Sequence, residues 1–193
     1  VKFAEQYYPE FLPKLSTCKS PQQMFGSLAR KMLPKMLDVA PENLVILSIM
    51  PCTAKKFEAK RPEFKTDGLA DVDFVLTTQE LGQMIKEAGL NLNALESESF
   101  DIPLGFKTGA GVIFGVTGGV SEAVLRYAVE KISGKVLENV DFKEARGLEG
   151  VREATYTVNG IEVKLALVHS LLNAKKIADA VRKGTVNYDL IEV

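Results

Sequence analysis

The residues with the clearest chemical potential lie in one short string around Cys52. From Met50 to Glu58 the chain reads Met-Pro-Cys-Thr-Ala-Lys-Lys-Phe-Glu, which places a thiol close to the ammonium groups of Lys55 and Lys56. Nearby positive charge favours the thiolate, the form of cysteine that binds metals and attacks electrophiles. The alternative is a small buried thiol followed by a solvated basic turn, and the spacing alone leaves both interpretations open.

Two glycine clusters, Gly109-Ala110-Gly111 and Gly118-Gly119, could form phosphate-binding turns. A dinucleotide-binding fingerprint needs the pattern G-x-G-x-x-G, and here Phe114 stands where the third glycine belongs. A Walker lysine is also missing from the sequence around these glycines. We therefore interpret Gly118-Gly119 as a tight turn into a helix, and keep nucleotide binding as an alternative.

Other potentially reactive side chains have no supporting pattern. His169 is the single histidine, and no Ser/His/acid set can be specified around it, so a structural role is expected. Cys18 has no partner motif. Asp71 and Asp73 alternate with apolar residues, which predicts that they form the solvated face where a strand begins.

Hydrophobic patterns indicate which elements position the string around Cys52. The apolar run Leu44–Met50 predicts a buried strand that ends just before Cys52. In open α/β sheets, sites gather at the carboxyl ends of strands. Ser20-Pro21 is a typical helix start, so a helix is expected over 21–33, closed by Pro34 and Pro41.

Strands alternate with helices along the whole chain, which favours an α/β fold. We expect two small lobes of mostly parallel sheet flanked by helices, lobe one at about 20–100 and lobe two at about 101–193, with Cys52 facing a cleft between them. The other expected elements are a strand at 71–77, a helix from the capping box Thr77/Glu80, a surface loop at 91–100, a helix at 121–132, a hairpin around Asn159-Gly160, a helix at 172–183 and a strand at 188–193.

Composition excludes several classes of function. The chain has 193 residues, of which 46% are hydrophobic, and its 24 basic residues nearly balance 25 acidic ones. Without a basic excess, neither nucleic acid nor an anionic membrane surface is an expected partner. Apolar runs are too short for a membrane-spanning helix. Two cysteines do not make a disulfide framework, so a reducing cytoplasm is expected.

The string Met50–Glu58 resembles the second signature motif of the iron-only (FeFe) hydrogenases. Val1–Gln23 is similar to the segment that follows that family's first motif. Phe114–Ala123 is similar to the start of its second lobe, and Tyr188–Val193 is similar to the strand that leads into its third motif. The resemblance covers the whole chain. It implies a fragment of the catalytic domain that begins just after the first cysteine motif and stops just before the third.

The resemblance also implies roles for individual residues. Cys52 resembles one of the four cysteine ligands of a 4Fe-4S cubane, which together with a two-iron subcluster makes up the H-cluster. Lys55 resembles the lysine that donates to a cyanide on the distal iron, and Ser16 the serine of the proton-transfer chain. Positions that enclose the two-iron site match Met50, Ser20, Pro21, Gln22 and Phe114.

A parent protein of this family would catalyse the reversible oxidation of dihydrogen to protons and electrons. Its expected partners are ferredoxin or nicotinamide-linked electron-transfer subunits, together with the remaining hydrogenase segments. Because Cys52 is the only cubane ligand carried over, we expect the isolated chain to bind no cluster and to be inactive. The alternative is a hydrogenase-like iron–sulfur assembly or sensory protein, against which Lys55 and Ser16 argue.

Overall fold

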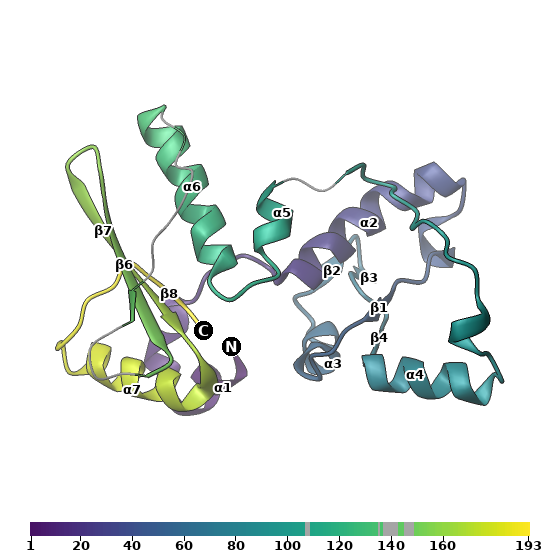
Figure 1. Cartoon of the computed structure of the whole chain (residues 1–193), viewed down its shortest axis with the longest axis horizontal. Helices are drawn as coiled ribbons and strands as arrows, with labels where there is room; N and C mark the ends of the chain where they lie inside the picture. Colours follow the sequence, from purple (N-terminus) through teal and green to yellow (C-terminus); the bar gives the residue numbers. More distant parts are fainter. Residues whose placement is uncertain (107–108, 135, 137–142, 145–148) are drawn as a thin grey trace. The chain divides into compact units, whose positions relative to one another are not determined.

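The computed structural model describes residues 1–106, 109–134, 136, 143–144 and 149–193 (Figure 1). These residues divide into two compact units. One unit combines Val1–Leu15 with Gly105–Val193, and the other is Ser16–Leu104. The first fifteen residues therefore fold with the C-terminal half of the chain, although they precede the other unit in sequence.

The unit Ser16–Leu104 is built on helix α2, Pro21–Leu37. The helix begins where the Ser20 hydroxyl accepts a hydrogen bond from the Gln23 amide, as the sequence predicts. It does not end at Pro34, which is a correction. Pro34 is buried inside the helix, and its carbonyl still accepts a bond from the Val39 amide at 3.0 Å, so the helix continues to a left-handed residue at Asp38.

Two short sheets lie in this unit. Strand β1, Leu47–Ile49, pairs in parallel with β4, Phe74–Leu76, while β2, Lys65–Thr66, and β3, Leu69–Ala70, form an antiparallel pair. The expectation that the first strand is buried is wrong for the described chain, because Leu47 and Ile49 are 49% and 48% exposed. A sheet of two strands has too few neighbouring elements to cover both faces.

Arg30 of α2 holds the two segments that lead into β1 and β4. Its guanidinium donates to the carbonyl of Leu44 at 2.5 Å, to the carbonyl of Ala70 at 2.7 and 3.0 Å, and to the carboxylate of Asp73 at 2.6 Å. Arg30 is only 4% exposed, so these bonds satisfy a charge that would otherwise be costly to bury.

Asp71 is buried rather than solvated, which corrects the expectation from its alternation with apolar residues. It has no exposed surface, and its carboxylate accepts from the Lys19 ammonium and from the Thr66 hydroxyl, each at 2.5 Å. The partner Lys19 comes from the loop before α2, a relationship that a local pattern cannot reveal. Asp73, in contrast, is exposed.

Helices α3, Ala54–Ala59, and α4, Thr78–Glu87, complete this unit with two 3-10 turns, Pro41–Asn43 and Leu92–Ala94. The predicted capping box is confirmed: the Thr77 hydroxyl accepts from the Glu80 amide at 3.1 Å, and the Glu80 carboxylate accepts from the Thr77 amide at 2.7 Å. Residues 91–100 are all exposed, in agreement with the expected surface loop.

The other unit is built on a long hairpin. Strands β6, Val151–Val158, and β7, Ile161–Val168, pair across the two-residue turn Asn159-Gly160, which confirms that prediction. Strand β5, Lys143–Glu144, pairs antiparallel with β6, and β8, Leu190–Glu192, runs parallel to β7.

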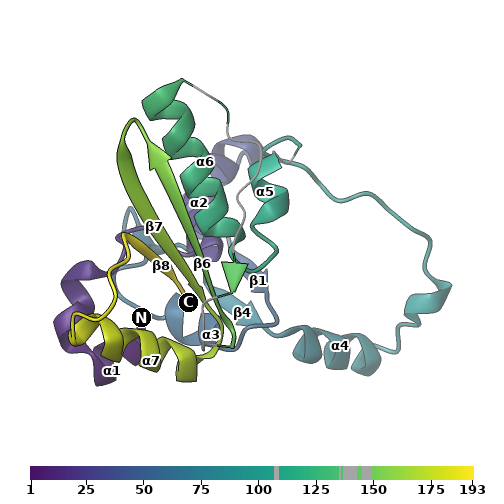
Figure 2. The ribbon, with the colours of Figure 1, turned by 60° about the vertical axis from the view of Figure 1, so that its left-hand side comes forward.

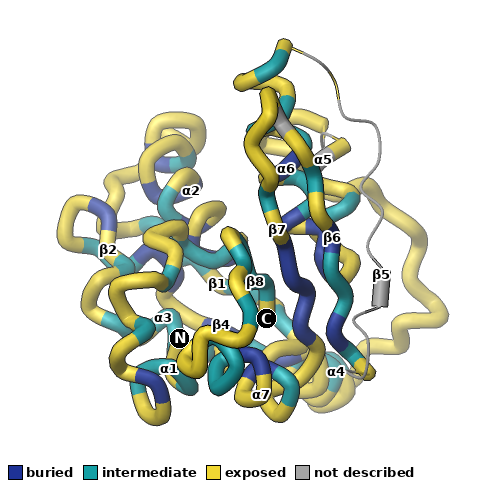
Figure 3. The backbone as a smooth tube through the Cα atoms, turned by 90° about the vertical axis from the view of Figure 1, so that its left-hand side faces the viewer, coloured by how far each residue is buried: buried dark blue, intermediate teal, exposed yellow. Residues whose placement is uncertain are grey.

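Two helices cover opposite faces of this sheet. Helix α6, Gly119–Ser133, lies along the hairpin through Leu125, which packs on Ala154 and Leu165 (Figure 2). Helix α7, Ser170–Arg182, contributes Ala174 and Ile177 to a core with Val151, Ala166 and Val168. The end of β7 nearest α7 is accordingly a continuous buried stretch (Figure 3).

The N-terminal segment docks on α7. Helix α1, Lys2–Tyr7, and the 3-10 helix Pro9–Lys14 flank Tyr8, which is 4% exposed. The Tyr8 hydroxyl donates to the Asp179 carboxylate at 2.9 Å, and the Arg182 guanidinium lies 4.6 Å from the centre of the Tyr8 ring. Burial and the bond to Asp179 raise the pKa of Tyr8 above its usual value.

These observations confirm the α/β class. Parallel pairing occurs in β1–β4 and β7–β8, whereas β2–β3, β5–β6 and β6–β7 are antiparallel. Between β6 and β7, a two-residue turn returns the chain beside the strand it has just left. The strands expected at Leu44–Met50 and Asp71–Thr77 do lie in a different sheet from the strands after Ala154. Among the described helices, none has the length and apolar character needed to cross a bilayer.

Candidate functional site

The predicted site residues are divided between the two units. Phe114 lies just after the short helix α5, Gly109–Ile113, in the unit that contains the hairpin, and is 40% exposed. All the others lie in the unit Ser16–Leu104, on two segments: Ser16, Ser20, Pro21 and Gln22 before and at the start of α2, and Met50, Cys52 and Lys55 after β1.

Cys52 lies at the carboxyl end of β1, as the sequence indicates. The Met50 amide donates to the Leu76 carbonyl at 2.8 Å, which extends the pairing of β1 with β4 by one bond. The Cys52 carbonyl then accepts from the Lys55 amide at 3.2 Å, where α3 begins. The thiol of Cys52 is exposed and not in a disulfide. This position gives the sulfur access to a metal.

Lys55 is held by Glu58, a residue to which the sequence interpretation assigned no role. The Lys55 ammonium lies 3.3 Å from one oxygen of the Glu58 carboxylate, and the Ser20 hydroxyl donates to the other oxygen. One carboxylate thus connects α3 to the start of α2. The contact between Lys55 and Glu58 could have been predicted from the sequence, because residues three apart on a helix are neighbours.

Lys56 has entirely different partners. Its ammonium donates to the Val75 carbonyl at 2.9 Å and lies 2.8 Å from the Glu80 carboxylate. The bond from Lys56, followed by the bond from the Thr77 amide, lowers the pKa of Glu80 from 4.5 to about 2. Lys56 therefore joins α3 to β4 and to the start of α4.

Two glutamines at the start of α2 have buried side-chain amides, and one of them contacts β1. The Gln22 side-chain oxygen accepts from the Ser48 hydroxyl at 2.9 Å, but its nitrogen is buried with no partner among the described residues. Gln23 has no exposed surface, and neither its side-chain oxygen nor its nitrogen has a partner there. Buried polar groups without partners are costly and call for an explanation.

Ser16 is exposed, and its hydroxyl oxygen accepts a hydrogen bond from the Cys18 amide at 3.2 Å. The hydroxyl hydrogen is still available to donate, so Ser16 retains the capacity to accept one proton while passing on another. Cys18 itself is exposed and not in a disulfide.

These residues fit one part of an iron–sulfur site. They supply one thiolate, one ammonium suited to an anionic ligand, and buried amides that lack partners. A cubane requires four thiolates, and within the described residues no group of three His, Cys, Asp or Glu side chains could hold a metal ion. The remaining ligands would therefore have to come from other residues.

The glycine-rich segment is a tight turn, as expected. A Cβ atom on Gly119 would lie 1.6 Å from the Ile113 carbonyl oxygen, so only glycine fits. The amide groups at the start of α6 are also engaged: the Glu192 carboxylate accepts from Gly118 at 3.2 Å and from Ser121 at 2.8 Å. A carboxylate of the chain itself occupies the position where a phosphate would bind.

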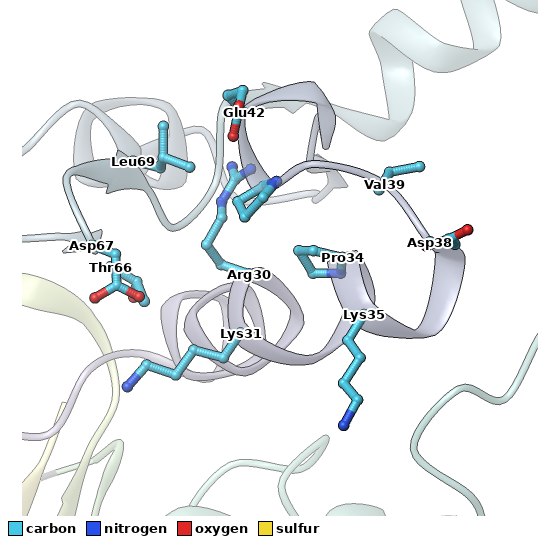
Figure 4. A pocket seen from close by; sticks show the side chains of 11 residues that line it. Arg30, Lys31, Pro34, Lys35, Asp38, Val39, Glu42, Thr66, Asp67 and Leu69 are labelled. Carbon is cyan, nitrogen blue, oxygen red and sulfur yellow. The ribbon is translucent and has the colours of Figure 1, made fainter.

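A cavity of about 930 Å³ lies along the C-terminal half of α2, away from the predicted site residues (Figure 4). Arg30 lines it, but its guanidinium is already bound to Leu44, Ala70 and Asp73. Figure 4 shows the Lys35 side chain pointing away from Arg30 and Glu42. The guanidinium of Arg30 is therefore not free to bind a ligand in this cavity.

Comparison with known proteins shows the family. The family described as "Iron only hydrogenase large subunit, C-terminal domain" matches residues 1–193, and the chain belongs to it. The chain is 48% identical over 191 residues to the periplasmic Fe hydrogenase large subunit of Nitratidesulfovibrio vulgaris, covering 99% of the chain and 45% of that protein. The resemblance noted in the sequence is thus confirmed.

A solved structure and a second class of relatives extend this result. An apo FeFe-hydrogenase HydA1 variant from Chlamydomonas reinhardtii has a TM-score of 0.84 and 36% identity, over 98% of this chain and 55% of that one. A probable cytosolic Fe-S cluster assembly factor of Culex quinquefasciatus is 32% identical over 100% of this chain and 42% of its own length. The chain thus spans about half the length of these proteins.

Proposed function

We propose that this chain is part of the catalytic domain of an iron-only hydrogenase that oxidises dihydrogen reversibly at an H-cluster. The observation that carries the proposal is the placement of Cys52 and Lys55 at the carboxyl end of β1, in a chain 48% identical to a hydrogenase large subunit. When bound, the H-cluster supplies the irons that split dihydrogen and store its electrons.

Each site residue of the chain has a task in this proposal. Cys52 contributes one thiolate ligand of the cubane. Lys55 donates a charge-assisted hydrogen bond to an anionic ligand, the strong kind of hydrogen bond. Ser16 passes protons through its hydroxyl. The residues proposed to enclose the two-iron site and limit the access of water are Met50, Ser20, Pro21, Gln22 and Phe114.

The isolated chain is proposed to bind no cluster and to have no activity, because it carries only one of the proposed ligands. Electron partners are proposed to be ferredoxin or nicotinamide-linked subunits, with the remaining hydrogenase segments completing the site. A cytoplasmic location stays a prediction, since the relatives named above include one called periplasmic and one called cytosolic.

An iron–sulfur assembly or sensory protein is the second candidate. It is supported by the assembly factor that is 32% identical over 100% of this chain. The hydrogenase proposal is favoured because the identity to the hydrogenase large subunit is higher, 48% against 32%.

The deciding experiment uses the full-length protein, prepared anaerobically with its iron cofactors. Dihydrogen evolution from a reduced dye is measured together with the infrared bands of carbonyl and cyanide ligands. A hydrogenase shows both signals. Cubane absorption without infrared bands and without turnover would overturn the proposal in favour of an assembly protein, and infrared bands with very slow turnover would indicate a sensor.

A further inference from the structure

Glu58 makes contact with two of the residues proposed to surround the two-iron site. Its carboxylate receives the Lys55 ammonium at 3.3 Å on one oxygen and the Ser20 hydroxyl on the other. Ser20 is 38 residues away from Glu58 in sequence. Its hydroxyl oxygen also accepts a hydrogen bond from the Gln23 amide and so caps α2. Glu58 therefore joins the two segments on which the proposed site residues lie.

This arrangement differs from an ordinary surface ion pair. The side chains of Lys55 and Glu58 are 23% and 21% exposed, so most of each is removed from water. Exposed pairs contribute little to stability, whereas a pair that is mostly buried leaves a costly charge when one partner is removed. The hydroxyl of Ser20 further fixes the carboxylate, because both of its oxygens are engaged.

The neighbouring lysine shows that the contact is selective. Lys56 pairs with Glu80, 2.8 Å away, and with the Val75 carbonyl rather than with Glu58. Two adjacent ammonium groups thus have two separate carboxylates, one in the same helix and one at the start of α4.

We propose that Glu58 is a positioning residue, which holds the Lys55 ammonium at the end of β1 so that its remaining N–H groups can donate to an anionic ligand. The inference rests on the proposed function for the identity of that ligand. The ammonium has three N–H donors, so it can donate to the carboxylate of Glu58 and to the anionic ligand at the same time. Glu58 is itself fixed by its bond to Ser20.

The first test needs no cofactor. The full-length protein is prepared without iron, and the acylation rates of Lys55 and Lys56 by an amine-reactive ester are measured by peptide mass spectrometry. Glu58→Gln should raise the rate at Lys55 about threefold, the change expected from losing a partly exposed ion pair, and leave Lys56 unchanged. Glu80→Gln is the matched control: it should raise the acylation rate at Lys56 and leave the rate at Lys55 unchanged.

Two outcomes would overturn the proposal in this test. One is an unchanged Lys55 rate in Glu58→Gln. The other is an equal rise at both lysines, which would indicate general loosening of α3. If Glu58→Gln does not fold, Glu58→Asp replaces it, because the shorter side chain withdraws the carboxylate while retaining its charge; Lys55 must again become more reactive than in the unaltered protein.

The second test uses the protein loaded with its cofactors. Glu58→Gln should shift the infrared cyanide band, since the ammonium that donates to the cyanide has lost its second partner, whereas Glu80→Gln should leave the band in place. Identical bands in all three proteins would contradict the proposal. If the unaltered protein shows no cyanide band, the proposed function fails, but the acylation test still decides whether Glu58 positions Lys55.

Discussion

The ammonium of Lys19 lies 2.5 Å from the carboxylate of Asp71, although the two residues are 52 positions apart. Asp71 has no exposed surface, and Lys19 is partly exposed, so the lysine reaches inward from the loop before α2. The same loop contains Ser16 and Ser20. The pair therefore connects a proposed proton-transfer residue to the segment that leads into β4.

Replacing Asp71 by Ala should destabilise the protein by about 3 kcal/mol, because it takes the buried carboxylate away from both the Lys19 ammonium and the Thr66 hydroxyl. The free energy of unfolding from denaturant titration measures this. Glu98→Ala is the control, since Glu98 is on the exposed surface loop, and its value should be unchanged. A loss below about 1 kcal/mol for Asp71→Ala would mean that the ion pair adds little.

In the full-length protein, Lys55→Asn should nearly abolish dihydrogen turnover and weaken retention of the two-iron site. Loss of a charge-assisted donor to a buried anion costs a few kcal/mol, enough to reduce turnover by orders of magnitude. Lys56→Asn should instead lower the melting temperature, because Lys56 bonds to Val75 and Glu80. Turnover and thermal unfolding are measured on both variants. Similar, mild losses of turnover in both would contradict the role of Lys55.

Glu80 should make stability depend on pH in acid. Its carboxyl has a pKa of about 2 in the folded protein against 4.5 without these contacts, so the contribution is complete above pH 4.5 and is lost as the pH falls towards 2. The melting temperatures of the unaltered protein and of Glu80→Gln should therefore converge over this range. A constant difference between the two proteins from pH 6 to pH 2 would show that the charge of Glu80 is not responsible.

The 193-residue chain alone should take up no cubane during anaerobic reconstitution with iron and sulfide. A single proposed thiolate ligand cannot hold four irons against competing chelators. Iron and acid-labile sulfide are measured after desalting, with a full-length preparation treated in parallel. About four irons per chain would show that Cys18 or other residues complete the set.

Gly119→Ala should severely destabilise the unit that contains the hairpin. The added methyl would lie 1.6 Å from the Ile113 carbonyl oxygen, a backbone atom that cannot move without displacing α5. Gly82→Ala in α4 is the matched control: nothing lies within 4 Å of its Cβ position, and alanine favours a helix by up to about 1 kcal/mol. Thermal unfolding separates the two. Equal melting temperatures for both variants would be incompatible with the tight turn.

Features that depend on neighbouring residues were predictable from the sequence. The turn at Asn159-Gly160 and the capping box of Thr77 and Glu80 are local, since the residues that define them lie within four positions. Cys52 at the end of a strand was also predictable, because an apolar run stops just before it. The family resemblance assigned site roles that geometry alone would not have suggested.

Features that depend on distant partners were not predictable. The alternation of Asp71 with apolar residues predicts a solvated side chain. Asp71 is buried instead, and its charge is compensated by the distant ammonium of Lys19. The bond between Ser20 and Glu58 likewise joins segments whose proximity is set by packing. Pro34 was expected to end α2, but a proline removes a single donor, and its burial in the folded unit outweighs that loss.

The contacts of Arg30 have a consequence for how the string around Cys52 is placed. A parallel pair of strands has no hairpin turn to define its alignment, and β1 and β4 are joined by a long crossover. The guanidinium of Arg30 donates to one backbone carbonyl before β1 and to another before β4. These bonds fix the alignment of the two strands relative to each other. A slip of β1 by one residue would turn its side chains to the opposite face of the sheet and displace the segment that carries Cys52. The placement of the proposed iron ligand thus depends on a side chain of helix α2.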